Sequence, residues 1–130
     1  MTVFCTYCSA EKETSTGPLP ALERYRSDRI RRIHQAAQSA GCGFRILSGE
    51  YGLIDGQAPI PWYDHLLVAD EVPAQAALLA GQLRQARISQ LLFFTLPVSV
   101  DEKLAPYHEA LRRACRETAT PLSFVEIDFA

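Results

Sequence analysis

Short apolar runs alternate along this chain with longer segments in which apolar residues recur at helical spacing. The runs are rich in aromatic and β-branched residues, which predicts strands, and they occupy residues 2–8, 43–48, 89–96 and 121–128. The segments between them carry the apolar stripe of an amphipathic helix and occupy residues 22–40, 71–87 and 101–118. Such alternation predicts parallel strands, joined by right-handed crossovers, with helices on both faces of the sheet.

The expected fold is a single α/β domain over residues 1–130, in three α/β/α layers with a mostly parallel sheet of about four strands. A chain of 130 residues is long enough for one hydrophobic core. Ser27 is expected to be the N-cap of the first helix, and Ser99 with Glu102 has the spacing of a capping box for the third. Pro106 either begins that third helix or kinks it.

The composition describes a globular chain without a strong net charge. Hydrophobic residues make up 48% and charged residues 22%, and the net charge is -2, which argues against a disordered chain. Contact with nucleic acid would therefore require a local basic patch. The sequence shows neither an apolar run of the roughly 18 residues that a membrane span needs nor a basic signal-peptide region. We expect a cytoplasmic protein without a membrane partner, with its four cysteines reduced.

Three polar segments are expected to meet at one edge of the sheet. They begin at or directly follow the ends of the first three predicted strands and occupy residues 8–12, 48–52 and 95–97. In parallel sheets, ligands bind beyond the carboxyl ends of the strands. The connection from residue 48 to residue 67 is also long and rich in Pro and Gly, which is typical of a functional loop. We therefore expect a binding site at this edge.

The first segment offers a thiol, a hydroxyl and an amine in Cys8, Ser9 and Lys12. Lys12 would be a nucleophile or bind an anion, Cys8 would be a nucleophile, and Ser9 would donate to an anion. The alternative is a packed thiol beside a solvated lysine. Cys5 and Cys8 have C-x-x-C spacing, but strand residues three apart face opposite sides of a sheet. No second cysteine pair completes a zinc site, so neither a metal nor another cofactor is expected.

Arg29 projects into the apolar stripe of the first predicted helix, close to its N-terminus. An inward-facing Arg at a helix N-terminus suits a phosphate or carboxylate ligand. The alternative is an Arg that reaches solvent or pairs with a structural carboxylate.

The second segment combines small, acidic and aromatic residues directly after a strand that ends at Ser48. Gly49 and Gly52 permit either close approach of the backbone to a ligand or a left-handed turn. Glu50 is a candidate acid or base, and Tyr51 is a candidate for stacking on a ligand. The alternative is a simple turn covered by the Tyr51 ring.

Tyr63, Asp64 and His65 follow two prolines in the long connection. Asp64 and His65 have the residue types of an acid–base pair, although neighbours in sequence seldom face each other. Asp64 is also suited to capping the following turn.

These motifs together resemble those of a family of small bacterial and phage domains whose function is not settled. The family pattern reads Cys-Ser-x-x-Lys, then Tyr-x-Ser, then Leu-Ser-x-x-Tyr-Gly-Leu-Ile, then Pro-x-Tyr-Asp. The corresponding segments here are residues 8–12, 25–27, 47–54 and 61–64. The resemblance implies that Tyr25, Ser27 and Tyr63 belong to the same site as Lys12.

The first motif is also similar to one in the core domain of archaeosine synthase, where the motif lysine is joined to a deazaguanine base in tRNA. Cys8, Ser9 and Lys12 match that motif, while Tyr7 stands where it has proline. The resemblance implies chemistry at Lys12 on a nucleobase. By analogy, the expected sheet is similar to the uracil-DNA-glycosylase type of α/β/α fold.

The leading hypothesis is a nucleobase-modifying or transferase-type enzyme that binds a nucleobase, nucleoside or nucleotide-like ligand. Its catalytic candidates are Lys12, Cys8, Glu50 and Asp64. Its ligand-binding candidates are Ser9, Tyr25, Ser27, Arg29, Ser48, Gly49, Tyr51, Gly52, Tyr63 and His65. The alternative hypothesis is a non-catalytic ligand-sensing or protein-interaction module of a phage-defence or nucleic-acid-modification system.

Overall fold

The first strand of the chain, β1 (Thr2–Tyr7), lies at the centre of a five-stranded sheet with the order β4-β3-β1-β6-β7. The computed structural model describes residues 1–130. The other strands of this sheet are β3 (Gly43–Ser48), β4 (Gly52–Asp55), β6 (Gln90–Thr95) and β7 (Leu122–Glu126). All neighbouring pairs are parallel except β3 and β4, which are antiparallel. The predicted α/β class and mostly parallel sheet are therefore confirmed.

The number of strands differs from the expected four because β4 forms inside the segment predicted to be a long connection. Gly52 has a φ of +72°, which glycine adopts without the steric cost that other residues meet. The chain therefore turns tightly after β3 and returns beside it. The rest of the connection contains β5 (Pro59–Ile60), which pairs with β2 (Leu19–Pro20) in a second, two-stranded sheet.

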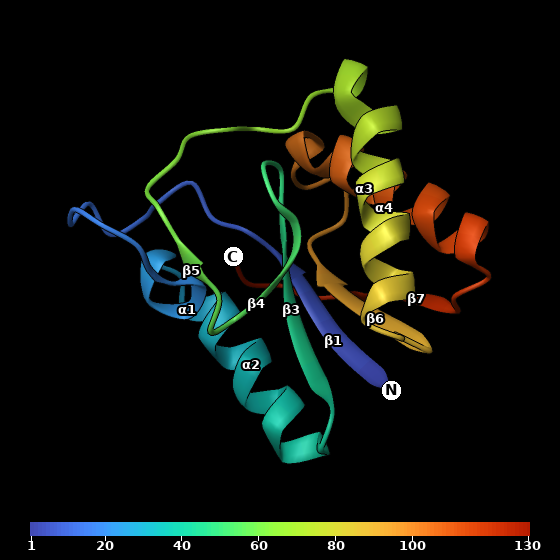
Figure 1. The fold of residues 1–130 in the computed structure, drawn as a ribbon, viewed down its shortest axis with the longest axis horizontal. Coiled ribbons are helices and arrows are strands. Elements are labelled where there is room, and N and C mark those ends of the chain that lie inside the picture. The colour runs from blue at the N-terminus through green and yellow to red at the C-terminus, as the bar shows by residue number, and fades with distance from the viewer.

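Helices cover both faces of the main sheet (Figure 1). On one face α2 (Asp28–Ala40) packs against β1 and β3, beside the single turn of α1 (Ala21–Arg24). On the other face lie α3 (Val72–Gln85) and α4 (Ala105–Thr118), which pack against each other. Each face has its own hydrophobic cluster. None of the helices is both long and apolar enough to span a bilayer.

The start of each helix depends on local capping chemistry, which confirms Ser27 as an N-cap and corrects two other expectations. The predicted helix over residues 22–40 is broken, because Ser27 is extended and its Oγ accepts the Ile30 N–H at 3.2 Å as the N-cap of α2. The expected Ser99 capping box is wrong. Instead, Asp101 accepts the Lys103 N–H at 3.2 Å and begins the short turn η2 (Glu102–Leu104) before α4. Pro106 lies in the first turn of α4, so it begins that helix.

Side chains of β1 alternate between the two faces, as a strand requires. Val3, Cys5 and Tyr7 belong to the cluster beneath α3 and α4, while Phe4 packs against the cluster on the α2 side. Burial raises the pKa of the Cys5 thiol well above its ordinary range. Cys5 is therefore a core residue, and all four cysteines are free thiols.

Candidate functional site

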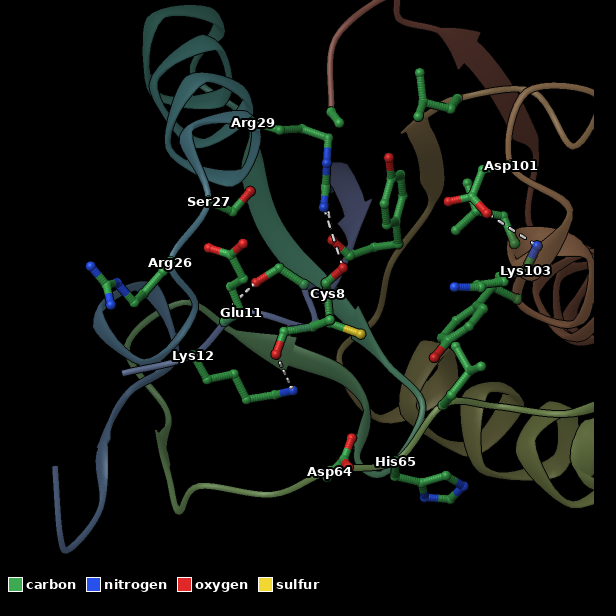
Figure 2. Close-up of a pocket in the computed structure, with 18 of the residues that line it drawn as sticks. Cys8, Glu11, Lys12, Arg26, Ser27, Arg29, Asp64, His65, Asp101 and Lys103 are labelled. Carbon is green, nitrogen blue, oxygen red and sulfur yellow. Dashed lines mark hydrogen bonds between the residues drawn. The ribbon is translucent and has the colours of Figure 1, made fainter. Parts of the chain in front are cut away.

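A cavity of about 480 Å³ opens at the carboxyl ends of β1 and β6 (Figure 2). One wall is the loop that follows β1, and the others come from the first turn of α2, residues 64–66 and the start of α4. The full lining is Tyr7, Cys8, Ser9, Ala10, Glu11, Lys12, Arg26, Ser27, Asp28, Arg29, Asp64, His65, Leu66, Leu96, Asp101, Lys103, Leu104, Tyr107 and Ala130.

The cavity brings together part of the set of candidate residues. The candidates in its lining are Cys8, Ser9, Lys12, Ser27, Arg29, Asp64 and His65. The candidates outside its lining are Tyr25, Ser48, Gly49, Glu50, Tyr51, Gly52 and Tyr63. Residues of the second group contact residues of the lining, as Tyr63 does Lys12 and Glu50 does His65.

Lys12 is buried although it carries an ammonium group, with 9% of its surface exposed. Its Nζ lies 4.7 Å from the centroid of the Tyr63 ring and 5.9 Å from that of Tyr25, so aromatic faces stabilise part of its charge. Nζ donates one long hydrogen bond, of 3.4 Å, to the Ala10 carbonyl. No carboxylate lies within ion-pair distance of it.

The loop that carries Lys12 is fixed by its backbone and by Arg24. Lys12 forms an isolated antiparallel bridge with Tyr25. Arg24 is fully buried, and its guanidinium donates to the carbonyls of Glu13, at 2.5 Å, and Ser15, at 3.1 Å. It also donates to the Gly17 carbonyl. Arg24 therefore has a structural role, although it neighbours the site in sequence.

Arg29 reaches from α2 to the end of β1 and is 3% exposed. It donates to the Thr6 hydroxyl and the Tyr7 carbonyl at 2.7 Å each and to the Cys8 carbonyl at 3.2 Å. Its guanidinium carbon lies 3.5 Å from the centroid of the Tyr7 ring. Burial lowers the pKa of the guanidinium, but an arginine side chain stays charged. Its Nε has no hydrogen-bond partner.

Three hydroxyls behind Lys12 form a hydrogen-bonded chain. Ser48 Oγ accepts the N–H groups of Glu50 and Tyr51, at 3.1 Å each. Its own hydrogen is therefore donated to the Tyr63 hydroxyl, at 2.8 Å. The hydroxyls of Tyr63 and Tyr25 share the next hydrogen bond, and the chain ends at Tyr25.

Cys8 lies beside the tyrosine hydroxyls at this end of the chain. Burial, and after it the neighbouring Cys8 thiol, raise the pKa of Tyr25, Tyr63 and Tyr107. The three phenols therefore stay protonated and can donate hydrogen bonds. The Tyr107 hydroxyl accepts the Leu67 N–H at 3.0 Å, so its own hydrogen is also available. Cys8 itself is a half-buried free thiol in the cavity lining.

The turn between β3 and β4 supports the cavity from outside its lining. A Cβ on Gly49 would lie 2.8 Å from the His65 carbonyl oxygen and 2.9 Å from the Tyr107 hydroxyl. Gly49 therefore allows close approach of another backbone segment. Gly52 makes the left-handed turn. The Tyr51 ring packs against Tyr63, with 5.1 Å between ring centroids.

His65 links the long connection to both of its neighbours. Its Nδ1 bonds the Glu50 carboxylate, and its Nε2 bonds the Glu71 carboxylate at 2.7 Å. These bonds, with Glu71 first and Glu50 second, raise the pKa of His65. Asp64 is exposed on the cavity rim, and it neither pairs with His65 nor caps the following turn. Glu50 therefore acts on the cavity only through His65.

Sequence reasoning missed the α4 side of the cavity, formed by Asp101, Lys103, Leu104 and Tyr107. The available signal was the end of the third predicted strand, because its last residue, Leu96, does line the cavity. A topological argument that included the element after that strand would have found them. No three His, Cys, Asp or Glu side chains come together in a way that could hold a metal ion.

Comparisons of this chain with family models, curated proteins and solved structures gave no match. The interpretation of the cavity therefore depends on its own geometry.

Proposed function

We propose that this protein binds a nucleobase, nucleoside or nucleotide-like ligand in the cavity and acts on it with Lys12 and Cys8. The observation that carries the proposal is a buried ammonium group, that of Lys12, at the wall of a cavity and without a carboxylate partner. Burial of an unpaired charge is costly, and a ligand that pairs with it offsets that cost.

The size and lining of the cavity support a ligand of this class. Its volume of about 480 Å³ lies in the range of roughly 300–1,000 Å³ that is usual for small-molecule sites. The lining combines charged and hydroxyl groups with apolar side chains, which suits a ligand with a polar part and a flat ring.

Each candidate would have a distinct part in the reaction. Lys12 would attack the ligand as a nucleophile or hold an anionic group, and Cys8 would be a second nucleophile. Asp64, at the rim, would exchange protons. Glu50 would be a positioning residue that orients His65.

The resemblances found in the sequence support the same proposal. The cavity brings residues 8–12 and Ser27 together with Asp64, and these come from three of the four motifs of the bacterial and phage family. We also propose that the helices on both faces of the sheet form a three-layer α/β/α fold of the uracil-DNA-glycosylase type. That assignment is consistent with a nucleobase as the ligand.

A non-catalytic ligand-sensing module, in a phage-defence or nucleic-acid-modification system, is the second candidate. The state of His65 favours it, because both ring nitrogens are bonded to glutamates and the imidazole is not free to be a base. An enzyme would return a chemically altered ligand, whereas a sensing module would return it unchanged.

The test begins with native purification of the wild type, Lys12→Ala and the matched control Lys103→Ala. Intact mass and the small molecules released on denaturation would be recorded for each. We expect a base-containing molecule or a mass adduct in the wild type and in Lys103→Ala, and its loss from Lys12→Ala. Titration with nucleobases, nucleosides and nucleotides would follow. An absence of binding by all of them would contradict the proposal.

A further inference from the structure

The two charged side chains of the lining that are buried, Lys12 and Arg29, are both cationic. Of the acidic residues in the lining, Glu11, Asp28 and Asp64 are exposed, while Asp101 is half-buried on the other side of the cavity (Figure 2). Charges interact more strongly in the protein interior than in water, so Lys12 and Arg29 contribute most to the field at their end of the cavity.

The buried cations have no acidic partner of their own. The donors of Arg29 that are satisfied bond two carbonyls and a hydroxyl, and its buried Nε bonds nothing. Lys12 has only its long bond to Ala10. Asp28 pairs with Arg31, at 3.1 Å, on the outer side of α2. Neither Lys12 nor Arg29 therefore has a carboxylate within ion-pair distance.

The first turn of α2 lines the same end of the cavity, through Ser27, Asp28 and Arg29. The first N–H groups of a helix have no intrahelical partner, and the helix dipole favours an anion there. Figure 2 shows Ser27 and Arg29 on one side of this end and Lys12 on another. Asp101 and Lys103 lie on the opposite side (Figure 2), and the apolar side chains of Leu96 and Leu104 belong to the same lining.

We infer that the ligand carries an oxyanion, a phosphate or a carboxylate, bound between Lys12 and the first turn of α2. Its flat, apolar part lies against Leu96, Leu104 and Tyr107. Arg29 acts on the anion through its charge, because its bonded donors hold the end of β1. This inference rests on the proposed function and narrows it, since nucleotides are favoured over free bases and nucleosides.

Calorimetric titration with inorganic phosphate, the common nucleosides and their 5′-monophosphates tests the inference. We expect a monophosphate to bind the wild type at least about tenfold more tightly than its nucleoside, as loss of one charge-assisted hydrogen bond implies. Lys12→Ala should abolish this preference. Lys103→Ala, which removes the same charge from the opposite end of the cavity, should reduce it far less. A nucleoside 5′-carboxylate in the same titration separates the two oxyanions.

Glu11→Gln removes a negative charge at the surface. Its effect on the affinity for phosphate should therefore have the opposite sign to that of Lys12→Ala. Glu11 is exposed in the lining at the Lys12 end of the cavity, so its removal should strengthen phosphate and monophosphate binding. This variant keeps the inference testable if Lys12→Ala does not fold, which circular dichroism and thermal melting would reveal.

The outcomes distinguish the inference from the proposed function. Equal affinity for nucleoside and monophosphate would overturn the inference and leave the proposed function in place. Lys12-dependent binding of phosphate, with no added affinity for a nucleotide, would support the anion site and overturn the nucleotide-like ligand. The inference would be overturned if Lys12→Ala and Glu11→Gln left phosphate binding unchanged. It would also be overturned if none of the titrants bound.

Discussion

The hydroxyls of Ser48, Tyr63 and Tyr25 form a hydrogen-bonded chain. Two backbone N–H groups occupy the acceptor sites of Ser48, so Ser48 donates to Tyr63. Because Tyr63 is in the middle, its hydroxyl is the one that bonds both of the others. Its ring also faces the Lys12 ammonium, so the chain links the β3–β4 turn to the cavity.

We predict that Tyr63→Phe lowers the free energy of unfolding by about 1–3 kcal/mol, because the buried Ser48 loses its acceptor and the buried Tyr25 loses its partner. Tyr51→Phe is the matched control, since the Tyr51 ring packs on Tyr63 while its hydrogen bond to Ser48 is made by its backbone N–H. That change should stay within roughly 0.5 kcal/mol. Urea unfolding measures both, and equal effects of the two substitutions would refute the stabilising role of the Tyr63 hydroxyl.

At the scale of elements, the β3–β4 hairpin positions the residues that close the cavity. Gly49 lies against the backbone of residues 65–67 and the hydroxyl of Tyr107. At Gly49 the hairpin therefore packs against both the long connection and α4. Gly81, in contrast, lies in α3 with nothing within 4 Å of the position of its missing Cβ.

We predict opposite effects of the same substitution at these two glycines. Gly49→Ala should destabilise the protein by about 1–3 kcal/mol, because the methyl group overlaps a backbone carbonyl that cannot move freely. Gly81→Ala should stabilise it by about 0.5–1 kcal/mol, because alanine is the better helix former. Thermal and denaturant unfolding would show the signs. A neutral Gly49→Ala would mean that the connection adapts to the hairpin.

The parallel core of the sheet was predictable from the sequence because its strands are continuous apolar runs separated by amphipathic helices. β4 was not predictable in this way, because its four residues begin at Gly52 and are followed by Gly56 in a turn-rich segment. The loop that follows β1 and the first turn of α2 were predicted as cavity walls from strand ends and helix phase. The position of Tyr107 was not, since it depends on how α4 packs against the end of the long connection, which no local pattern encodes.

At the scale of the whole molecule, two histidines give stability opposite dependences on pH. His108 is buried, and burial, followed by Arg112, lowers its pKa to about 4 from 6.5. Between these two pH values His108 is protonated in the unfolded chain but not in the folded protein. The contribution of His108 to stability is therefore lost as pH falls through this window. For His65, whose pKa is raised, the contribution is present below 6.5 and is lost as pH rises through the raised value.

We predict that the free energy of unfolding falls by up to about 3 kcal/mol between pH 6.5 and 4 through His108. His108→Phe should remove most of this acid-side slope, and His65→Gln should instead flatten the decline at higher pH. Denaturant unfolding from pH 4 to pH 9 at constant ionic strength measures both slopes. If the free energy of unfolding of His108→Phe still fell as steeply on the acid side, the carboxylates would be responsible for that slope.

β1 is the central strand of the sheet although it is the first strand in the chain. Its neighbours come from residues 43–48 and 90–95. During synthesis, one hydrogen-bonding edge of β1 therefore stays open until β6 has left the ribosome. Pairings of such long sequence separation slow folding compared with a helical chain of similar length. Because β1 contributes to the hydrophobic clusters on both faces, we expect the two halves of the protein to fold together in one cooperative step.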